Sequence, residues 1–372
     1  MKICMLTTGH SPLDDRIFHK EALSLKKVYD EVYIVAPNEN KTESCNGIKI
    51  IGVENPSSLF ERFKLVDKVI DKAIEVNADV YHFHDFEIVF KIMKIKKLLP
   101  NCKIVYDVHE HYPDMFRMSK KIPTLLKPML TLFIDKYELH IGKKADYIIT
   151  ADDAVKERFI DYNSNVDVVY NFSEFNIKEE NDIKKEYDAI YQGGITLERG
   201  VFEVVKAIKI VTETCKDVKM IFVGPFNDLA AKEKVFNYIS ENKLENNISF
   251  IGKVPHTEVE GYIRKSKIGI VTLLPLPKYF KNIPIKQFEY MSCGIPIVGS
   301  YLPPIKKFIE SYNSGIIVDP TKPEEIAAAI IKLLEDTELA KKLGKNGVRA
   351  VTEEYNWANM EKKLLEIYKK LQ

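Results

Sequence analysis

Short apolar runs alternate with longer amphipathic runs along almost the whole chain. Runs such as Glu31–Pro37 and Lys103–His109 are rich in branched residues, which is typical of buried strands. The run Leu59–Asn77 instead repeats its apolar residues at helical spacing. Strands that alternate with helices form crossover units, and these units build parallel sheets. The pattern therefore predicts an α/β fold made of doubly wound parallel sheets.

The predicted strands fall into two groups on either side of a charged stretch. Residues 173–186 are poor in branched residues and contain the run Lys-Glu-Glu-Asn-Asp-Ile-Lys-Lys-Glu, which indicates a linker. A chain of 372 residues also suits two domains better than one core. We therefore predict domains at 1–172 and 187–356. The strands predicted in the first are Met1–Thr8, Glu31–Pro37, Ile48–Val53, Asp79–Asp85, Lys103–His109, Asp146–Ala151 and Val166–Phe172. Those predicted in the second are Asp188–Gly193, Val218–Gly224, Ile248–Gly252, Ile268–Leu274, Ile295–Val298 and Gly315–Val318.

Composition excludes several classes of protein. The 55 basic and 54 acidic residues leave a net charge of +1, which argues against a general nucleic-acid binder. The five cysteines show no C-x-x-C spacing, so we expect a reducing compartment and no structural zinc. The chain starts directly with an apolar strand, and it contains no apolar run of about eighteen residues. We therefore expect a cytoplasmic protein without a signal peptide or a membrane span.

The stretch Asn282–Ser300 carries the strongest signal for a ligand. Pro284 suits the start of a helix and Gly294 its end, while Lys286 and Glu289 are three residues apart and so share one face. A helix start with a nearby cation binds an anion, and a carboxylate can accept hydrogen bonds from a pair of hydroxyls. Phosphate, cation and carboxylate together indicate a nucleotide-sugar site. The alternative is an ordinary amphipathic helix with a Lys–Glu pair.

This stretch reads N-x-P-x-K-x-F-E-Y-M-x-x-G-x-P and resembles the donor-site helix of retaining GT-B glycosyltransferases of family 4, the glycosyl transferases group 1. The resemblance covers nearly the whole chain. It implies two Rossmann-like domains facing a central cleft, with the last helix, 357–372, crossing back onto 1–172. It also implies that Glu289 binds the ribose of the nucleotide. Many members carry a second Glu eight positions earlier, where this chain has Lys281.

The second domain opens with a Gly-rich turn that suits a close approach to phosphate. The family's usual form is G-R-L-x-x-E-K-G, and here Gly194 stands at the Arg position and Arg199 at the Lys position. We expect Arg199, helped by Lys286, to hold the diphosphate, since a guanidinium binds oxygens bidentately. Alternatively, Arg199 pairs with Glu198 or Glu203 at the surface.

Further donor contacts follow from the resemblance alone. Gly224 and Val254 lie in loops that contact the base and the sugar in the family. The first loop, Thr-Thr-Gly-His-Ser-Pro-Leu-Asp-Asp-Arg, resembles the family's opening and places Gly9 at the donor and His10 at the acceptor. In the alternative reading of this loop, Asp14 caps the helix that starts near Asp15 and Arg16 pairs with an acid.

Two predicted strands end in clusters of His and acidic residues. The first ends in His-Phe-His-Asp at Asp85, and the second in Asp-Val-His-Glu at Glu110. The resemblance implies that His109 contacts the donor sugar near the reacting centre, and we expect Asp85 and Glu110 to contact the acceptor. Two alternatives stay open: a metal site at these clusters, and a core role for the histidines, above all His82.

Residues 118–144 contain six lysines interspersed with leucine, methionine and phenylalanine residues. This pattern suits either a solvated helix face or a contact with an anionic membrane surface. The resemblance favours a weak peripheral contact, because many family members take lipid-linked acceptors. We therefore expect a location at the inner face of the cytoplasmic membrane.

These observations predict a glycosyltransferase that moves a sugar from a nucleoside diphosphate sugar, UDP- or GDP-linked, to a hydroxyl of a glycan or a lipid-linked glycan, with retention. The catalytic residues are His109, Arg199 and Lys286, and no metal or other cofactor is expected. The resemblance implies a same-face reaction in which the leaving phosphate takes the acceptor's proton. The alternatives are a nucleotide-sugar epimerase and a non-catalytic sugar-nucleotide binder.

Overall fold

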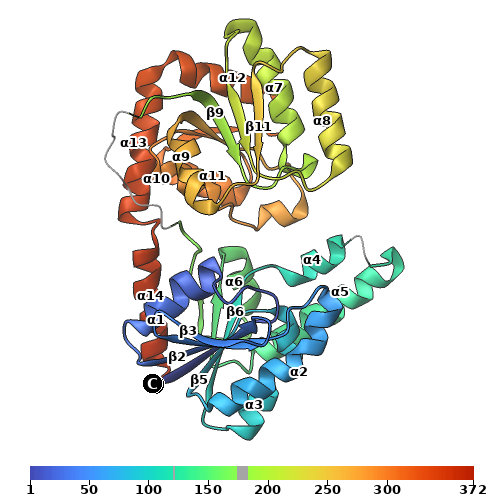
Figure 1. The fold of residues 1–372 in the computed structure, drawn as a ribbon, viewed down its shortest axis with the longest axis vertical. Coiled ribbons are helices and arrows are strands. Elements are labelled where there is room, and N and C mark those ends of the chain that lie inside the picture. The colour runs from blue at the N-terminus through green and yellow to red at the C-terminus, as the bar shows by residue number, and fades with distance from the viewer. Residues whose placement is uncertain (120–121, 174–182) are drawn as a thin grey trace. The chain divides into compact units, whose positions relative to one another are not determined.

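The computed structural model describes residues 1–119, 122–173 and 183–372 (Figure 1). The chain divides into two compact units. Unit 1 consists of Met1–Asn171 and Trp357–Gln372, and unit 2 of Phe172–Asn356. Most of the predicted linker, 174–182, lies outside the described residues.

Unit 1 contains an eight-stranded sheet with the strand order β3-β4-β2-β1-β5-β6-β7-β8. Every pairing is parallel except that of β3 with β4. The edge strand β3 was not predicted, because its residues are mostly exposed and polar and give no apolar signal. The strands are β1 (Lys2–Leu6), β2 (Glu31–Pro37), β3 (Thr42–Cys45), β4 (Ile48–Val53), β5 (Val80–Phe83), β6 (Lys103–Val108), β7 (Tyr147–Thr150) and β8 (Val166–Val168).

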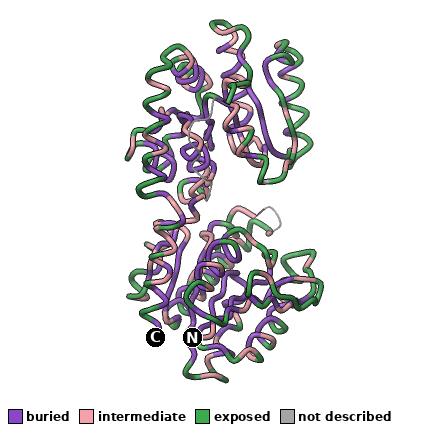
Figure 2. Tube along the Cα trace, turned by 60° about the vertical axis from the view of Figure 1, so that its left-hand side comes forward, coloured by how far each residue is buried: buried purple, intermediate pink, exposed green. Residues whose placement is uncertain are grey.

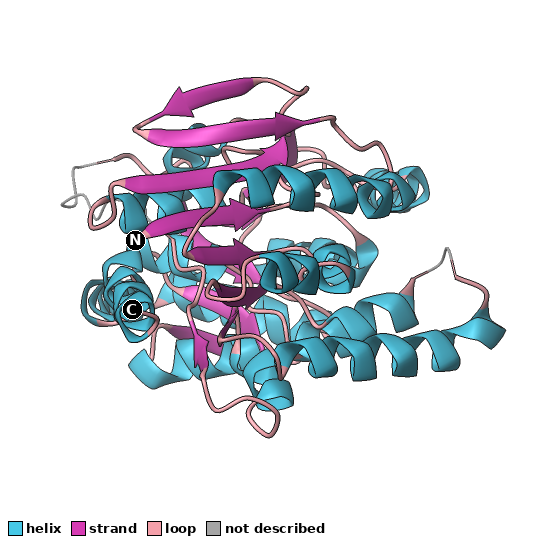
Figure 3. Cartoon of the chain, turned by 90° about the horizontal axis from the view of Figure 1, so that it is seen from below, coloured by secondary structure: helices cyan, strands magenta, loops and turns pink. Residues whose placement is uncertain are grey.

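Both faces of this sheet are buried, because side chains alternate between them along each strand. In β1, Cys4 and Leu6 join one apolar cluster, whereas Ile3 and Met5 join another. Figure 3 shows helices on either side of the strands. Most residues of the central strands are buried, and Figure 2 marks buried residues in purple along the trace. The helices are η1 (Asp15–Ala22, a π-helix), α1 (Leu23–Lys26), α2 (Leu59–Val76), η2 (Phe86–Phe90), α3 (Met93–Leu98), α4 (Tyr112–Met118), η3 (Thr124–Leu126), α5 (Lys127–Gly142), α6 (Asp153–Phe159) and α14 (Trp357–Lys370).

The last helix, α14, packs within unit 1 through both apolar and polar contacts. The indole of Trp357 donates to Ser24 Oγ at 3.0 Å, and the hydroxyl of Tyr368 lies 2.8 Å from His82 Nδ1. His82 is fully buried. This contact matches the core role that was one of the two readings of His82.

Unit 2 contains a six-stranded parallel sheet with the strand order β11-β10-β9-β12-β13-β14. The order places β9 beside β12 at the centre of the sheet, and the first turn of this unit follows β9. The strands are β9 (Tyr187–Gln192), β10 (Met220–Val223), β11 (Ile248–Gly252), β12 (Ser266–Val271), β13 (Ile297–Ser300) and β14 (Gly315–Val318). The helices are η4 (Leu197–Arg199), α7 (Val201–Thr214), α8 (Leu229–Glu241), α9 (His256–Arg264), η5 (Pro277–Phe280), α10 (Lys286–Ser292), α11 (Pro303–Tyr312), α12 (Pro323–Glu335) and α13 (Thr337–Glu353).

One local prediction in unit 2 was wrong. The strand predicted at Ile295–Val298 begins two residues later, because the amide of Ile295 still donates to the helical carbonyl of Tyr290 and Pro296 has no amide hydrogen. Thr321 lies just before α12 and does not cap it, because its amide and its hydroxyl both donate to Asp319 Oδ1. Among the described residues, no helix combines the length and apolarity needed to cross a bilayer.

Candidate functional site

In unit 2, the turn after β9 brings two backbone segments into close contact. The amide of Gly193 donates to the carbonyl of Val223 at 2.8 Å, and Gly193 has a φ of +108°. Gly224 has a φ of +147°, and a Cβ placed there would lie 2.0 Å from the carbonyl oxygen of Gly193. Only glycine fits this contact. The donor contact predicted for Gly224 stays a prediction. The close contact with Gly193 already explains why a glycine occupies this position.

Two cations lie beside this turn. A Cβ built on Gly193 would lie 3.6 Å from both Arg199 Nη1 and Lys286 Nζ, and one built on Gly194 would lie 3.5 Å from Arg199 Nη1. The guanidinium contacts the hydroxyls of Tyr191 and Tyr279. It therefore faces the glycine turn, where a phosphate would be held.

The alternative partners of Arg199 lie elsewhere. Glu198 pairs with Lys278, and no ion pair between Arg199 and Glu198 or Glu203 occurs among the described residues. The surface ion pair that sequence reasoning left open is therefore not formed.

Lys286 is a buried cation without a hydrogen-bond acceptor among the described residues. Its Nζ lies 3.7 Å from the centre of the Tyr191 ring, which stabilises the charge only partly. Burial lowers the pKa of the ammonium well below its usual range, and the charge of Arg199 lowers it further against the opposing effect of Glu289. Such a group gains its charge most readily when an anion arrives.

Glu289 lies one turn along α10 from Lys286 and is almost fully buried. The side-chain amide of Gln192 donates to its carboxylate. The carboxylate is therefore held at the carboxyl end of β9, next to the glycine turn. The helix-start amides play a smaller part than predicted: those of Gln287, Phe288 and Glu289 all donate to carbonyls of the same turn.

The loop after β11 carries the remaining predicted donor contact. Gly252 ends β11 with a φ of +81°, and Val254 follows it half-buried. Its donor contact stays a prediction.

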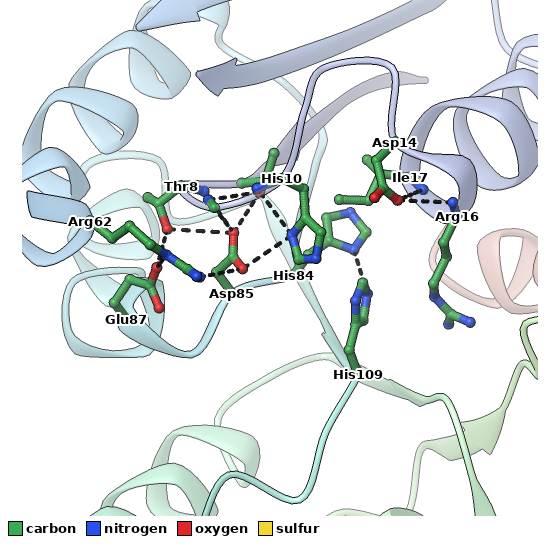
Figure 4. A network of polar contacts seen from close by, with 12 residues as sticks. Thr8, His10, Asp14, Arg16, Ile17, Arg62, His84, Asp85, Glu87 and His109 are labelled. Atoms are coloured by element: carbon green, nitrogen blue, oxygen red, sulfur yellow. Dashed lines mark hydrogen bonds and ion pairs between the residues drawn. The ribbon is translucent and has the colours of Figure 1, made fainter. Parts of the chain in front are cut away.

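In unit 1, the carboxylate of Asp85 organises the loop after β1 (Figure 4). It is buried, and Oδ2 accepts hydrogen bonds from the hydroxyl of Thr7 at 2.5 Å, the amide of Thr8 at 2.7 Å and the amide of Gly9 at 3.0 Å. Oδ1 lies 2.8 Å from Arg62 Nη2. Burial alone would raise the pKa of Asp85, but these bonds and the neighbouring charges hold it far below its usual range.

Arg62 and Glu87 complete this network, and sequence reasoning missed both. Arg62 comes from α2 and pairs with Asp85 and with the buried Glu87, which also accepts a hydrogen bond from Thr8 at 2.6 Å. A Cβ on Gly9 would lie 2.2 Å from Arg62 Cζ. The close approach at Gly9 is therefore to Arg62, and the donor contact predicted for Gly9 stays a prediction.

A second buried carboxylate, Asp107 on β6, contacts one guanidinium group and two imidazole rings. Arg16 donates to both of its oxygens at 2.9 Å and to the carbonyl of Val169 at 2.8 Å. His84 Nδ1 and His109 Nε2 lie 3.2 Å and 2.9 Å from Asp107 Oδ2. His109 is therefore oriented by Asp107 and keeps Nδ1 for a further contact.

The structural reading of Asp14 and Arg16 is confirmed. Asp14 caps η1 by accepting hydrogen bonds from the amides of Arg16 and Ile17 at 2.9 and 3.0 Å. Arg16 pairs with an acid, as that reading required.

One group of buried residues could offer ligands to a metal. Atoms of Glu21, His82, His84 and Asp107 all lie within 4.8 Å of one another. Arg16 Nε, however, lies 3.0 Å from Glu21 Oε1 and 2.9 Å from Asp107 Oδ2, so a side-chain cation already contacts both carboxylates. This charge disfavours a second cation, and the expected metal independence stays a prediction.

The structure brings several predicted residues of unit 1 together. His10 lies 3.2 Å from Asp85, and its ring centre is 5.3 Å from that of His109. Glu110 follows β6 and lies near Asp152; burial raises the pKa of Asp152 to about 6, and the charge of Glu110 adds to that rise. The roles of these side chains in binding an acceptor stay predictions.

Comparison with known sequences identifies the family. The profile for Glycosyltransferase Family 4 matches residues 17–173, and the profile for Glycosyl transferases group 1 matches residues 173–350. The chain belongs to the family 4 glycosyltransferases. The two profiles meet at residue 173, close to the boundary between the two units.

Individual relatives of this glycosyltransferase are distant. An uncharacterised glycosyltransferase of Methanocaldococcus jannaschii is 29% identical over 68% of this chain and 65% of its own length. The α-D-kanosaminyltransferase of Streptomyces kanamyceticus is 25% identical over 49% of this chain and 45% of its own. Each match thus spans less than two thirds of the relative.

Solved structures show the GT-B fold over the full chain. HepE from Anabaena in complex with UDP has a TM-score of 0.75 and 17% identity, and the match covers 100% of both chains. Sucrose-phosphate synthase from Thermosynechococcus elongatus has a TM-score of 0.75 and 16% identity, covering 100% of this chain and 98% of that one.

Proposed function

We propose that the glycosyltransferase moves a hexosyl group from a nucleoside diphosphate sugar to a hydroxyl of a glycan or lipid-linked glycan, with retention at the anomeric carbon. The observation that carries this proposal is the buried amine of Lys286, which lies beside Arg199 at the Gly193 turn and has no hydrogen-bond acceptor among the described residues. A buried cation of this kind is costly unless an anion joins it, and a diphosphate supplies that anion. Retention rests on the family resemblance.

Each residue then has a defined task. Arg199 and Lys286 stabilise the negative charge that builds up on the leaving diphosphate, which is electrostatic catalysis. Glu289 accepts hydrogen bonds from the ribose hydroxyls. His109, oriented by Asp107, contacts the sugar. A UDP-linked donor is favoured over a GDP-linked one because the neighbouring structures of HepE contain UDP and UDP-glucose.

The alternative epimerase reading is weakened by the structure. An epimerase would need a free carboxylate pair, for which Asp85 would be one candidate. The Asp85 carboxylate is already engaged by Arg62, His10 and the loop after β1. Because Arg199 and Lys286 already supply positive charge, we also propose that the reaction needs no divalent metal.

Glu289 provides the direct test of the nucleotide site. The substitution Glu289→Gln keeps the side-chain volume but removes the charge, so we expect affinity for UDP to fall about 10- to 100-fold, the loss of a charge-assisted hydrogen bond. Titration calorimetry with UDP measures this change. Glu335→Gln, at an exposed position of α12, is the matched control and leaves the affinity unchanged. Equal affinities for Glu289→Gln and the wild type would remove Glu289 from the site.

We further propose that α5 contacts the anionic lipids at the inner face of the cytoplasmic membrane. Four apolar side chains stand out from η3 and α5, with exposed fractions of 90%, 69%, 54% and 54%: Leu125, Met129, Leu132 and Phe133. The last three line an open groove of about 420 Å³ together with Lys136, Tyr137 and His140. Exposed apolar residues beside lysines suit an anionic lipid surface. Lys120 and Lys121 of the predicted stretch lie outside the described residues.

Sedimentation with lipid vesicles tests this surface. We expect binding to vesicles that contain phosphatidylglycerol, weaker binding to pure phosphatidylcholine, and at least a tenfold loss in the double variant Met129→Glu, Phe133→Glu. Leu229→Glu changes an apolar residue on α8 that is more exposed than Met129 or Phe133, and it should have no effect. Unaltered vesicle binding by the double variant would mean that α5 is an ordinary solvated helix.

A further inference from the structure

The loop after β10 is held against the glycine turn that follows β9. The amide of Ile195 donates to the carbonyl of Pro225 at 2.8 Å, and Ile195 forms a parallel bridge with Phe226. The amide of Asn227 donates to the carbonyl of Ile195 at 3.4 Å, and the next residue, Asp228, is the N-cap of α8. Because the contacts with the turn run from backbone to backbone, they fix the position of Asn227 beside it.

The side-chain amide of Asn227 faces the same turn as the guanidinium of Arg199. A Cβ built on Gly194 would lie 3.0 Å from Asn227 Nδ2 and 3.5 Å from Arg199 Nη1. An amide nitrogen and a guanidinium can only donate hydrogen bonds. Two donating groups therefore converge on one point of the turn. A phosphate accepts hydrogen bonds at several oxygens, so it can bind both groups at once.

The amide of Asn227 is not engaged elsewhere. Asn227 is exposed, and its side chain makes no hydrogen bond within residues 1–119, 122–173 and 183–372. The glycine at 194 leaves the space beside it open, since even a methyl group there would press against Nδ2. A ligand that reaches the turn therefore meets a donor that it does not have to take from another partner.

The two glycines of the turn have different neighbours. A Cβ on the first would lie 3.6 Å from both Lys286 Nζ and Arg199 Nη1, whereas the side chains nearest to a Cβ on the second are those of Asn227 and Arg199. Lys286 shares α10 with Glu289, the proposed contact of the ribose. Arg199 thus lies between the ribose side of the turn and Asn227. The phosphate within reach of Asn227 is therefore the one farther from the ribose.

We propose that Asn227 binds the distal phosphate of the nucleoside diphosphate, which is the phosphate that carries the sugar in the donor. Its Nδ2 donates a hydrogen bond to an oxygen of that phosphate, next to the guanidinium of Arg199. This inference rests on the proposed function and adds a neutral donor to the two cations of the site. All of these residues belong to unit 2. A nucleoside monophosphate has no distal phosphate, so Asn227 contributes nothing to its binding.

Calorimetry of the full chain with UDP and with UMP tests this assignment. Asn227→Ala removes the donor, so we expect the affinity for UDP to fall about tenfold, the effect of losing a hydrogen bond to a charged group. The affinity for UMP should stay unchanged. Asn227→Asp keeps the shape of the side chain but sets a carboxylate against the phosphate. The affinity for UDP should therefore fall further in Asn227→Asp than in Asn227→Ala.

Asn246 provides the matched controls. It is exposed and precedes β11, at the end of the sheet opposite to the glycine turn, so Asn246→Ala and Asn246→Asp should bind both nucleotides as the wild type does. An unchanged affinity for UDP in Asn227→Ala, or an equal loss for UDP and UMP, would overturn the role of Asn227. The proposed function would then still stand on the binding of UDP by the wild type. A wild type that binds neither nucleotide would refute the proposed function, and the role of Asn227 with it.

Discussion

Replacing Arg199 by alanine is expected to lower turnover about 10²- to 10³-fold, the usual cost of removing one preorganised donor from a developing negative charge. The guanidinium lies 3.6 Å from a Cβ position on Gly193, beside Lys286. Its contacts to Tyr191 and Tyr279 hold it there without neutralising it. Release of nucleoside diphosphate from a nucleotide sugar, measured at saturating donor, gives the turnover.

Two further variants make the result specific for Arg199. Arg199→Lys keeps the charge but loses the bidentate fork, so we expect it to recover part of the rate. Arg349→Ala, at an exposed position on α13, should leave the rate unchanged. If Arg199→Ala turned over at the normal rate, the diphosphate would have to be held by Lys286 alone.

Replacing Lys286 by methionine is expected to stabilise the fold while weakening diphosphate binding. The ammonium is buried without an acceptor among the described residues, and methionine fills a similar volume without a charge. We expect a gain on the order of 1 kcal/mol in the free energy of unfolding near neutral pH. UDP affinity should fall at least tenfold, because an oxygen of the diphosphate loses its cation. Thermal melting and calorimetry measure the two effects, and Lys332→Met on the surface of α12 is the control.

The pH dependence follows from the lowered pKa of Lys286. Because the folded state releases this proton at a lower pH than the unfolded state, the unfolded state binds more protons between the lowered pKa and about pH 10.5. Stability should therefore rise with pH across that window in the wild type, and Lys286→Met should lose this rise.

Binding of an anion reverses the shift, so UDP binding above the lowered pKa should take up a proton. Calorimetry in buffers of different ionisation enthalpy detects this uptake, and Lys286→Met should show none. A wild type that binds UDP without proton uptake, or a Lys286→Met variant that is less stable than the wild type, would contradict this account of Lys286 as a buried amine that gains its proton when the diphosphate binds.

Much of the fold could be predicted because buried parallel strands leave a strong apolar signal. The predicted bounds of β2, β4, β11 and β14 agree with the structure. The misses have local causes: β3 is mostly exposed, and β13 starts after a proline that cannot join the ladder. The π-helical geometry of η1 also leaves no mark in a spacing pattern.

The grouping of residues in the candidate site was predictable where those residues belong to a sequence motif. Lys286, Glu289 and Arg199 lie together at the first turn of unit 2, as their positions in the motifs suggested. Arg62 was not predictable, because it is one charged residue on an amphipathic helix and meets Asp85 only through the tertiary fold. Gln192, the last residue of β9, was also missed, because its contact with Glu289 likewise forms only through the tertiary fold.

Binding of nucleoside diphosphates to the purified protein tests the central claim most directly. Calorimetry of the wild type with UDP, GDP, ADP and CMP should show saturable binding of one nucleoside diphosphate, with UDP favoured, together with proton uptake. If none of the four bound, the Gly193 turn with Arg199, Lys286 and Glu289 would not be a nucleotide site, and the proposed transfer from a nucleotide sugar would be wrong.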